Sequence, residues 1–224
     1  MPTSRQSTAA ARRRAREKEI LDATRQLFDE TGVRDAQIDD IARAVGVNRA
    51  IIYRHFSGKE ELFALTLVSY LDDLHDELAK AAARGDATGS ATDRLVAIVA
   101  AFVDFGLAYP AFVDCAQTLM RRPGPELLEE ISESSLFRLG RGIAACLTVL
   151  STALDDGVVS GEFNPMDTTL LANHMYASGL GALQLARVGM LVHEVAPGVP
   201  AVAELSAEQV KGYLVATARA LATG

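Results

Sequence analysis

The stretch from Arg34 to Glu60, RDAQIDDIARAVGVNRAIIYRHFSGKE, predicts two short helices joined by a tight turn. Four apolar residues follow the i, i+3, i+4, i+7 spacing of one helix face, namely Ile38, Ile41, Ala42 and Val45. Gly46 ends that helix, because a residue without a Cβ adopts the left-handed backbone of a C-cap at little cost. Asn48 is a favourable N-cap for the second helix, where Ile52 and Phe56 continue the buried face. Such a pair forms a helix-turn-helix, whose second helix enters the major groove of DNA.

The charge of this stretch favours a polyanionic partner. Between Ile41 and Lys59 the chain has four cations and no acid. Arg49 is the expected reader of a guanine, because its planar guanidinium matches two acceptors of that base. The residues that we expect to contact DNA in this stretch are Gln37, Asn48, Arg49, Ile51, Tyr53, His55 and Lys59. The alternative is a solvated helical hairpin, but the cap, the turn glycine and the basic face coincide here.

Eleven residues of this region resemble the signature of the TetR family of bacterial transcriptional regulators. They fill the pattern IAxxxGVxxxxIYxHFxxKExL with Ile41, Ala42, Gly46, Val47, Ile52, Tyr53, His55, Phe56, Lys59, Glu60 and Leu62. The resemblance covers the first third of the chain. It implies an all-α protein with an N-terminal three-helix DNA-binding region, followed by a larger helical region for ligand binding and dimerisation. Ala36, Gln37 and Ile51 depart from the usual family residues, so the operator sequence does not carry over.

The overall composition is that of a soluble globular protein with a strong division of charge. The 224 residues are 49% hydrophobic and 23% charged, with a net charge of −7. Residues 1–63 hold 12 basic and 10 acidic residues, a net +2, whereas residues 64–224 hold 10 and 19, a net −9. The positive excess therefore lies where DNA would bind, and the acidic remainder is repelled from phosphates.

Residues 1–16 carry five arginines and no acid. We expect a flexible basic arm in which Arg12, Arg13 and Arg14 lie along the phosphates or enter the minor groove. A solubilising tail is the alternative. The expected organisation is this arm, a helix-turn-helix domain over residues 17–63, and a ligand-binding and dimerisation domain over residues 64–224.

The rest of the chain shows helical periodicity, and no segment shows the alternation and turn signals of a sheet. We predict helices at residues 17–30, 59–84, 91–108, 110–120, 126–154, 165–191 and 206–222, with a loop at 195–202.

The helix at 165–191 is rich in small residues that allow close helix approach: Ala172, Ser178, Gly179, Gly181, Ala182, Ala186 and Gly189. Ordinary packing within one chain would explain them. The family resemblance instead implies that this helix and the last one form a four-helix bundle between two subunits. A homodimer also suits a palindromic site, because it places two recognition helices about 34–36 Å apart.

Sparse polar residues among apolar helices suggest a ligand pocket in the second region, with Tyr109, Gln117 and His174 as first candidates. The histidines are scattered and no metal or phosphate-binding motif occurs, so we expect no metal, no cofactor and no enzymatic activity. A small helical enzyme using Cys115 or His174 is the remote alternative. Cys115 and Cys146 are expected to be reduced thiols, with redox sensing as the other option.

These features predict a homodimeric repressor that is released from a palindromic operator in double-stranded DNA by a small, largely apolar effector. The alternative is a regulator of the same fold controlled by a protein partner, or an activator, without a small ligand. We expect a cytoplasmic protein without a membrane segment, because the N-terminus is polar and the apolar run at Leu95–Val103 is short.

Overall fold

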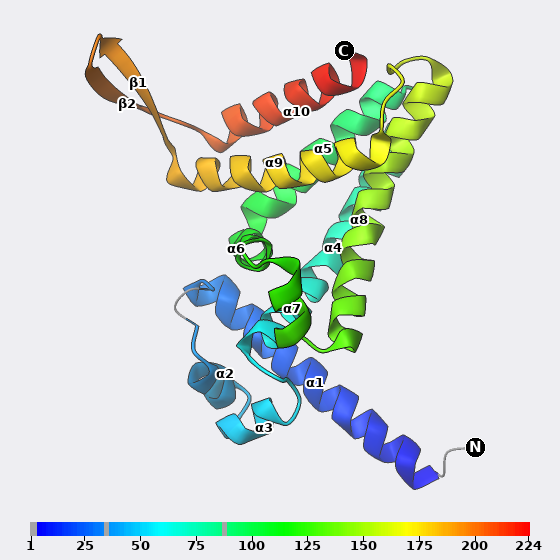
Figure 1. Cartoon of the computed structure of the whole chain (residues 1–224), viewed down its shortest axis with the longest axis vertical. Coiled ribbons are helices and arrows are strands. Elements are labelled where there is room, and N and C mark those ends of the chain that lie inside the picture. The colour runs from blue at the N-terminus through cyan, green and yellow to red at the C-terminus, as the bar shows by residue number, and fades with distance from the viewer. Residues whose placement is uncertain (1–3, 34–35, 87–88) are drawn as a thin grey trace. The chain divides into compact units, whose positions relative to one another are not determined.

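The fold consists of ten helices and one hairpin within residues 4–33, 36–86 and 89–224, which the computed structural model describes (Figure 1). The helices are α1 (Ser4–Thr31), α2 (Ile38–Ala44), α3 (Arg49–Tyr53), α4 (Lys59–Asp86), α5 (Ala91–Ala108), α6 (Pro110–Met120), α7 (Gly124–Glu130), α8 (Glu133–Ser160), α9 (Thr168–Val188) and α10 (Ala207–Thr223), and the strands are β1 (Met190–Ala196) and β2 (Val199–Glu204). The expected all-α class is confirmed apart from this hairpin.

The chain forms two compact units. The first comprises residues 1–70 and 110–141, and the second comprises residues 71–109 and 142–224. Both α4 and α8 pass from one unit to the other. The expected boundary after residue 63 therefore differs from the structural division, because α6, α7 and the start of α8 belong with the N-terminal helices.

Helix α1 begins much earlier than the sequence suggested, since residues 4–16 continue it as regular helix. Its sequence from Ala9 to Glu19 contains alanine, arginine, lysine and glutamate, which are strong helix formers, and no proline or glycine. The basic segment expected as a flexible arm is thus helical from Ser4 onward, and residues 1–3 lie outside the described residues.

The helix-turn-helix forms as its sequence predicts. Gly46 has φ +69°, in the left-handed region, and the amide of Val47 donates to the carbonyl of Ala42 at 2.9 Å. The side-chain oxygen of Asn48 accepts from the amide of Ile51 at 3.1 Å, which caps α3. The apolar face is buried, since Ile41, Ala42, Ile52 and Phe56 are at most 4% exposed.

A buried carboxylate organises the first unit. Glu61, 5% exposed, accepts hydrogen bonds from the amide of Ser57, from the hydroxyl of Ser135 at 2.7 Å, and from the hydroxyl of Ser132. Burial alone raises the pKa of this carboxyl, but the bonds from Ser132, Ser57 and Ser135 outweigh burial and lower the pKa from 4.5 to about 2. Glu61 therefore joins the loop after α3 to the start of α8.

The second unit is a bundle in which α5, α9 and α10 pack on one another. Glycine permits two of its close approaches. A Cβ on Gly106 of α5 would lie 2.3 Å from Leu183 of α9, and one on Gly179 would lie 2.7 Å from Phe102. Gly179 and the buried Ala172 thus pack within the chain, so part of the small-residue stripe serves the intrachain core rather than a subunit interface.

The predicted helix over residues 126–154 is wrong as a single element, because α7 ends at Glu130 and α8 begins at Glu133. Ile131 is extended (φ −120°, ψ 133°) and buried, while the hydroxyl of Ser132 accepts a hydrogen bond from the amide of Ser135.

By length and composition α8 could cross a membrane, as could the bent pair α5 and α6, and 33% of the apolar window of α8 is buried. Core helices of globular proteins share this composition.

The absence of a sheet was also predicted wrongly. Gly189, at φ +68°, ends α9, and β1 pairs antiparallel with β2 in a register that places Val192 opposite Val202. Gly198 at φ +76° forms the turn. The hairpin extends away from α9 and α10 (Figure 1), and all of β1 is exposed. Because neither face is buried, the sequence carries no period-2 alternation of apolar and polar residues.

The carboxylate of Glu61 should make the stability of the protein depend on pH. Because its folded-state pKa lies below its unfolded value of 4.5, its stabilisation is complete above about pH 5 and is lost as the pH falls toward about 2. We expect Glu61→Gln to lower the free energy of unfolding at pH 7 by about 2 kcal/mol and to flatten this acid dependence. Urea unfolding at several pH values measures both effects.

Glu129→Gln is the matched control, since Glu129 is exposed on the neighbouring helix α7. It should leave both quantities near their wild-type values. If Glu61→Gln and Glu129→Gln show the same acid dependence, the serine-bound carboxylate is not the source of the stabilisation.

Candidate nucleic-acid interface and apolar cavity

The short helix α3 presents a polar, basic outer face. Its exposed residues include Asn48, Arg49, Arg54 and Tyr53, which is 42% exposed, whereas Ile52 is buried. Of the other predicted contacts, Gln37 is exposed at the N-cap of α2, and Ile51, His55 and Lys59 are half-buried. The structure therefore brings the predicted residues of α3 onto one surface, with Gln37 and Lys59 on its flanking elements.

Arg49 is held along the surface of α3. Its guanidinium donates to the hydroxyl of Tyr53 at 3.1 Å and lies 5.3 Å from the centre of that ring. Asp39 of α2 is 3.9 Å away, a loose ion pair between exposed side chains. The hydrogen bond from Arg49 to Tyr53 raises the pKa of the guanidinium, which keeps its charge. Arg49 and Tyr53 thus form one exposed polar pair that can meet a base edge or a phosphate.

Lys59, the first residue of α4, places its ammonium 5.0 Å from the ring centre of Phe63. Lys59 is half-buried, as is usual for a lysine at the edge of an apolar surface. The two following residues, Glu60 and Glu61, are acidic. Lys59 is therefore the cationic group at this end of α4.

The three arginines predicted from the N-terminal segment separate in the structure. Arg12 and Arg13 line a shallow cleft together with Arg16, Arg54 and His55, and Arg14 does not. Arg16 and Arg54 were not among the residues predicted from the sequence. The signal was available, because a helix continued back through residue 12 places positions 12, 13 and 16 on the same side.

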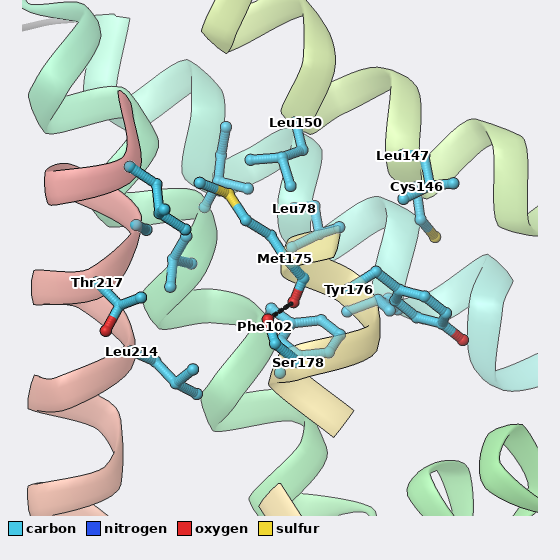
Figure 2. Close-up of a pocket in the computed structure, with 16 residues that line it drawn as sticks. Leu78, Phe102, Cys146, Leu147, Leu150, Met175, Tyr176, Ser178, Leu214 and Thr217 are labelled. Atoms are coloured by element: carbon cyan, nitrogen blue, oxygen red, sulfur yellow. Dashed lines mark hydrogen bonds between the residues drawn. The ribbon is translucent and has the colours of Figure 1, made fainter. Parts of the chain in front are cut away.

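An apolar cavity lies within the second unit (Figure 2). Its volume, measured as the space open to the centre of a water-sized molecule, is about 60 Å³; it is partly open to solvent and is lined by residues of five helices. The lining residues are Leu74 and Leu78 of α4, Ile98, Val99 and Phe102 of α5, Cys146, Leu147 and Leu150 of α8, Met175, Tyr176, Ser178 and Gly179 of α9, and Leu214, Thr217, Ala218 and Leu221 of α10.

The polar groups of this cavity are neutral. The thiol of Cys146 donates to the carbonyl of Leu71 at 3.4 Å, and the hydroxyl of Ser178 donates to the carbonyl of His174 at 2.8 Å. Burial and the charge of Asp72 raise the pKa of Cys146 to about 12, and burial also raises the pKa of Tyr176. These side chains therefore stay uncharged at neutral pH.

None of the three predicted ligand residues lines this cavity. Tyr109 is exposed at the end of α5, against the ring of Phe105. Gln117 is half-buried on α6 in the first unit, and His174 is exposed on α9. Sequence reasoning selected polar residues, whereas the cavity is formed mostly by leucine and other apolar side chains that look like ordinary core.

His174 lies on an exposed stripe of α9. The stripe is formed by residues at helical spacing that all face solvent, namely Leu170, Asn173, His174, Ala177, Gly181, Leu185 and Val188. Gly181 has nothing within 4 Å of its Cβ position. On α10, Tyr213 is 73% exposed and Leu221 is 43% exposed. These two helices thus present apolar surface that the second unit itself does not cover.

Both cysteines are buried, Cys115 fully and Cys146 at 5% exposure. Burial and the nearby carboxylates of Asp114 and Asp29 raise the pKa of Cys115 as well. A redox-sensing thiol needs exposure and a low pKa. The environments of both thiols therefore disfavour that role.

The family match to known proteins falls on the segment that contains the helix-turn-helix. The family described as bacterial regulatory proteins, tetR family, matches residues 20–66. The chain is 33% identical over 126 residues to the HTH-type transcriptional regulator BetI of Cronobacter sakazakii (strain ATCC BAA-894), a match that covers 54% of this chain and 62% of that protein. Less than two-thirds of this relative is therefore matched.

Solved structures share the fold at low sequence identity. The FadR regulator of Bacillus subtilis in complex with stearoyl-CoA has a TM-score of 0.64 at 15% identity, covering 90% of this chain and 96% of that one. RolR in complex with resorcinol has a TM-score of 0.63 at 16% identity, covering 95% and 90%. Residues 20–66 thus match the tetR family of bacterial regulatory proteins, and the whole chain shares the fold of these solved structures.

Proposed function

We propose that this protein is a homodimeric transcriptional repressor that binds a palindromic operator in double-stranded DNA and is released by a small, uncharged, largely apolar ligand. The observation that carries the proposal is the outer face of α3, where Asn48, Arg49 and Tyr53 are exposed above a buried apolar face. Hydrogen-bonding side chains on a short helix of this kind suit the base edges of the major groove. A location in the cytoplasm, with the DNA, belongs to the same proposal.

The chemistry of the cavity supports the choice of ligand. The sixteen residues drawn around it in Figure 2 are uncharged at neutral pH. A charged ligand would lose its hydration there without gaining a counter-ion, which costs several kcal/mol or more. A neutral molecule that fills apolar walls and offers a hydroxyl or carbonyl group fits better. FadR and RolR, the two structural neighbours described above, were solved with small molecules bound.

The exposed stripe of α9 and the outer face of α10 support the dimer. Leu170, Leu185 and Val188 of α9 and Tyr213 of α10 are all more than 40% exposed. Apolar side chains gathered on adjacent helices are a common feature of subunit interfaces. A twofold dimer would cover them with the same residues of a second copy.

The coupling between ligand and DNA is a population shift. The ligand binds better to the conformation whose two recognition helices do not match the half-site spacing. By reciprocity it must bind more weakly to the DNA complex, by the same factor by which it weakens DNA binding. Control by a protein partner, or activation instead of repression, is the second candidate, and a ligand titration of the DNA complex separates it from the first.

The first prediction concerns base reading by Arg49. On a duplex selected from a random library by the wild-type protein, Arg49→Ala should cost about 1–3 kcal/mol and relax the preference at one base pair per half-site. Arg43→Ala is the control, because Arg43 is equally charged, lies on α2 and pairs with Asp40 at 2.8 Å. If Arg49→Ala weakens all sequences equally, as loss of a phosphate contact would, Arg49 does not read a base.

The second prediction concerns the dimer. Gly181→Arg should give a folded monomer with greatly weakened binding to the palindrome, because a long charged side chain enters the exposed stripe of α9. Gly140→Arg on α8 is the control, since Gly140 is also exposed with nothing within 4 Å of its Cβ position. Sedimentation velocity measures the outcome. A normal dimer for Gly181→Arg would exclude this stripe as the subunit interface.

The third prediction concerns the ligand. Decanol should raise the melting temperature and release the operator more effectively than decanoate or decyltrimethylammonium, which share its tail but carry a charge. Leu147→Trp, which fills the cavity, should abolish both effects, whereas Thr148→Trp on the exposed side of α8 should not. Stabilisation without release would remove ligand control and favour the partner-controlled regulator, and a preference for the charged probes would contradict the assignment of a neutral ligand.

A further inference from the structure

We propose that the cleft formed by Arg12, Arg13, Arg16, Arg54 and His55 is a subsite for a backbone phosphate of DNA, and that His55 takes up a proton when the phosphate binds. This inference rests on the proposed DNA-binding function and deepens it. It joins α1 and the segment after α3 in one phosphate site and makes operator affinity depend on pH.

The cleft is assembled from two elements of the first unit. The three residues of α1 follow the spacing i, i+1, i+4, which places them on neighbouring positions of the helix surface. Arg54 and His55 come directly after α3, the recognition helix. The cleft is open to solvent, with about 350 Å³ accessible to the centre of a water-sized molecule, which leaves room for a phosphate group.

The cleft carries excess positive charge. Arg16 pairs with Glu19 at 2.9 Å, but Arg12, Arg13 and Arg54 form no ion pair among the side chains that the structure describes. Two acids that line the adjoining polar space have partners of their own: Glu17 pairs with Arg138 at 2.7 Å, and Glu61 accepts hydrogen bonds from serine donors. Guanidinium groups gathered without counter-ions bind phosphate well, because their planar donors match its oxygens.

His55 is the titratable member of this cleft. Its Nδ1 atom is buried, with no hydrogen-bond partner in the described part of the chain. Burial lowers its pKa below 6.5, Arg13, Arg54 and Arg16 lower it further, and Glu17 opposes them. Glu61 of α4 and Arg138 of α8 also line the polar space beside His55. The free protein therefore holds His55 neutral at pH 7.

A bound phosphate changes this balance. Its negative charge offsets the positive charges of Arg13, Arg16 and Arg54, which lower the pKa of His55 in the free protein. Its oxygens accept hydrogen bonds from an imidazolium, in which both ring nitrogens are donors. The pKa of His55 then rises and a proton is taken up with the DNA. By linkage, operator affinity decreases as the pH rises from the pKa of the free state to the higher pKa of the bound state, and it is independent of this histidine outside that interval.

The first test measures operator affinity from about pH 5.5 to about pH 8 at constant ionic strength, where histidines titrate and most carboxyls do not. Wild-type affinity should rise on acidification by up to about tenfold for each unit by which phosphate raises the pKa. His55→Gln should bind with little pH dependence across this range. An equal pH dependence in both proteins would overturn the proposal.

Two arginine variants provide a matched comparison. Arg13→Gln removes a cleft cation, and Arg14→Gln removes the same charge one residue away, outside the cleft. Both should lower affinity through the general attraction to DNA. Arg13→Gln alone should also raise the pKa of His55 in the free protein and reduce the pH dependence. Identical behaviour of the two variants would mean that only net charge matters.

Nuclear magnetic resonance of the histidine rings gives a direct reading. The pKa of His55, assigned with His55→Gln, should rise on adding the operator duplex, while His75, His174 and His193 of the second unit serve as internal references. Inorganic phosphate alone should produce a much smaller rise, which separates a DNA subsite from a site for the free anion. A bound duplex that leaves the His55 pKa unchanged overturns the subsite, whereas failure to bind any duplex overturns the proposed function itself.

Discussion

The hydrogen-bonded carboxylate of Glu61 is the constraint on which the first unit depends. It is buried, keeps its charge, and satisfies donors from the loop after α3 and from the turn between α7 and α8. A buried charge that lost these partners would be costly, so the segments cannot separate without a large penalty. Through the amide of Ser57, the loop that follows α3 is fixed to segments more than 70 residues later in the chain.

Local signals in the sequence predicted most of the helices, and long-range contacts explain the exceptions. The bounds of α5 and α6, the left-handed Gly46 and the Asn48 cap agree with the structure, because each depends on a few neighbouring residues. The break at Ile131 was missed because Ser132 is fixed by Glu61, far away in the sequence. The hairpin after Gly189 was missed because its strands bury neither face.

The two candidate sites differed in how far the sequence could predict them. The exposed face of α3 is a property of one short segment, so Asn48, Arg49 and Tyr53 could be named from spacing and chemistry. The apolar cavity is assembled from five helices, and residues such as Leu150 and Met175 have no local feature that distinguishes them from core. The polar residues predicted from the sequence, Tyr109, Gln117 and His174, lie outside this cavity. The basic segment was identified correctly as cationic, but its helical form added Arg16 to Arg12 and Arg13.

The placement of the two cysteines has a consequence for following the motions of this protein. Cys115 belongs to the first unit and Cys146 to the second, and both are buried with raised pKa values. A thiol reagent can reach either sulfur only when the surrounding helices open. Labelling kinetics, resolved for each cysteine by mass spectrometry, would thus report the opening free energies of the two units separately in an unmodified chain. The native sequence carries one built-in reporter for each unit.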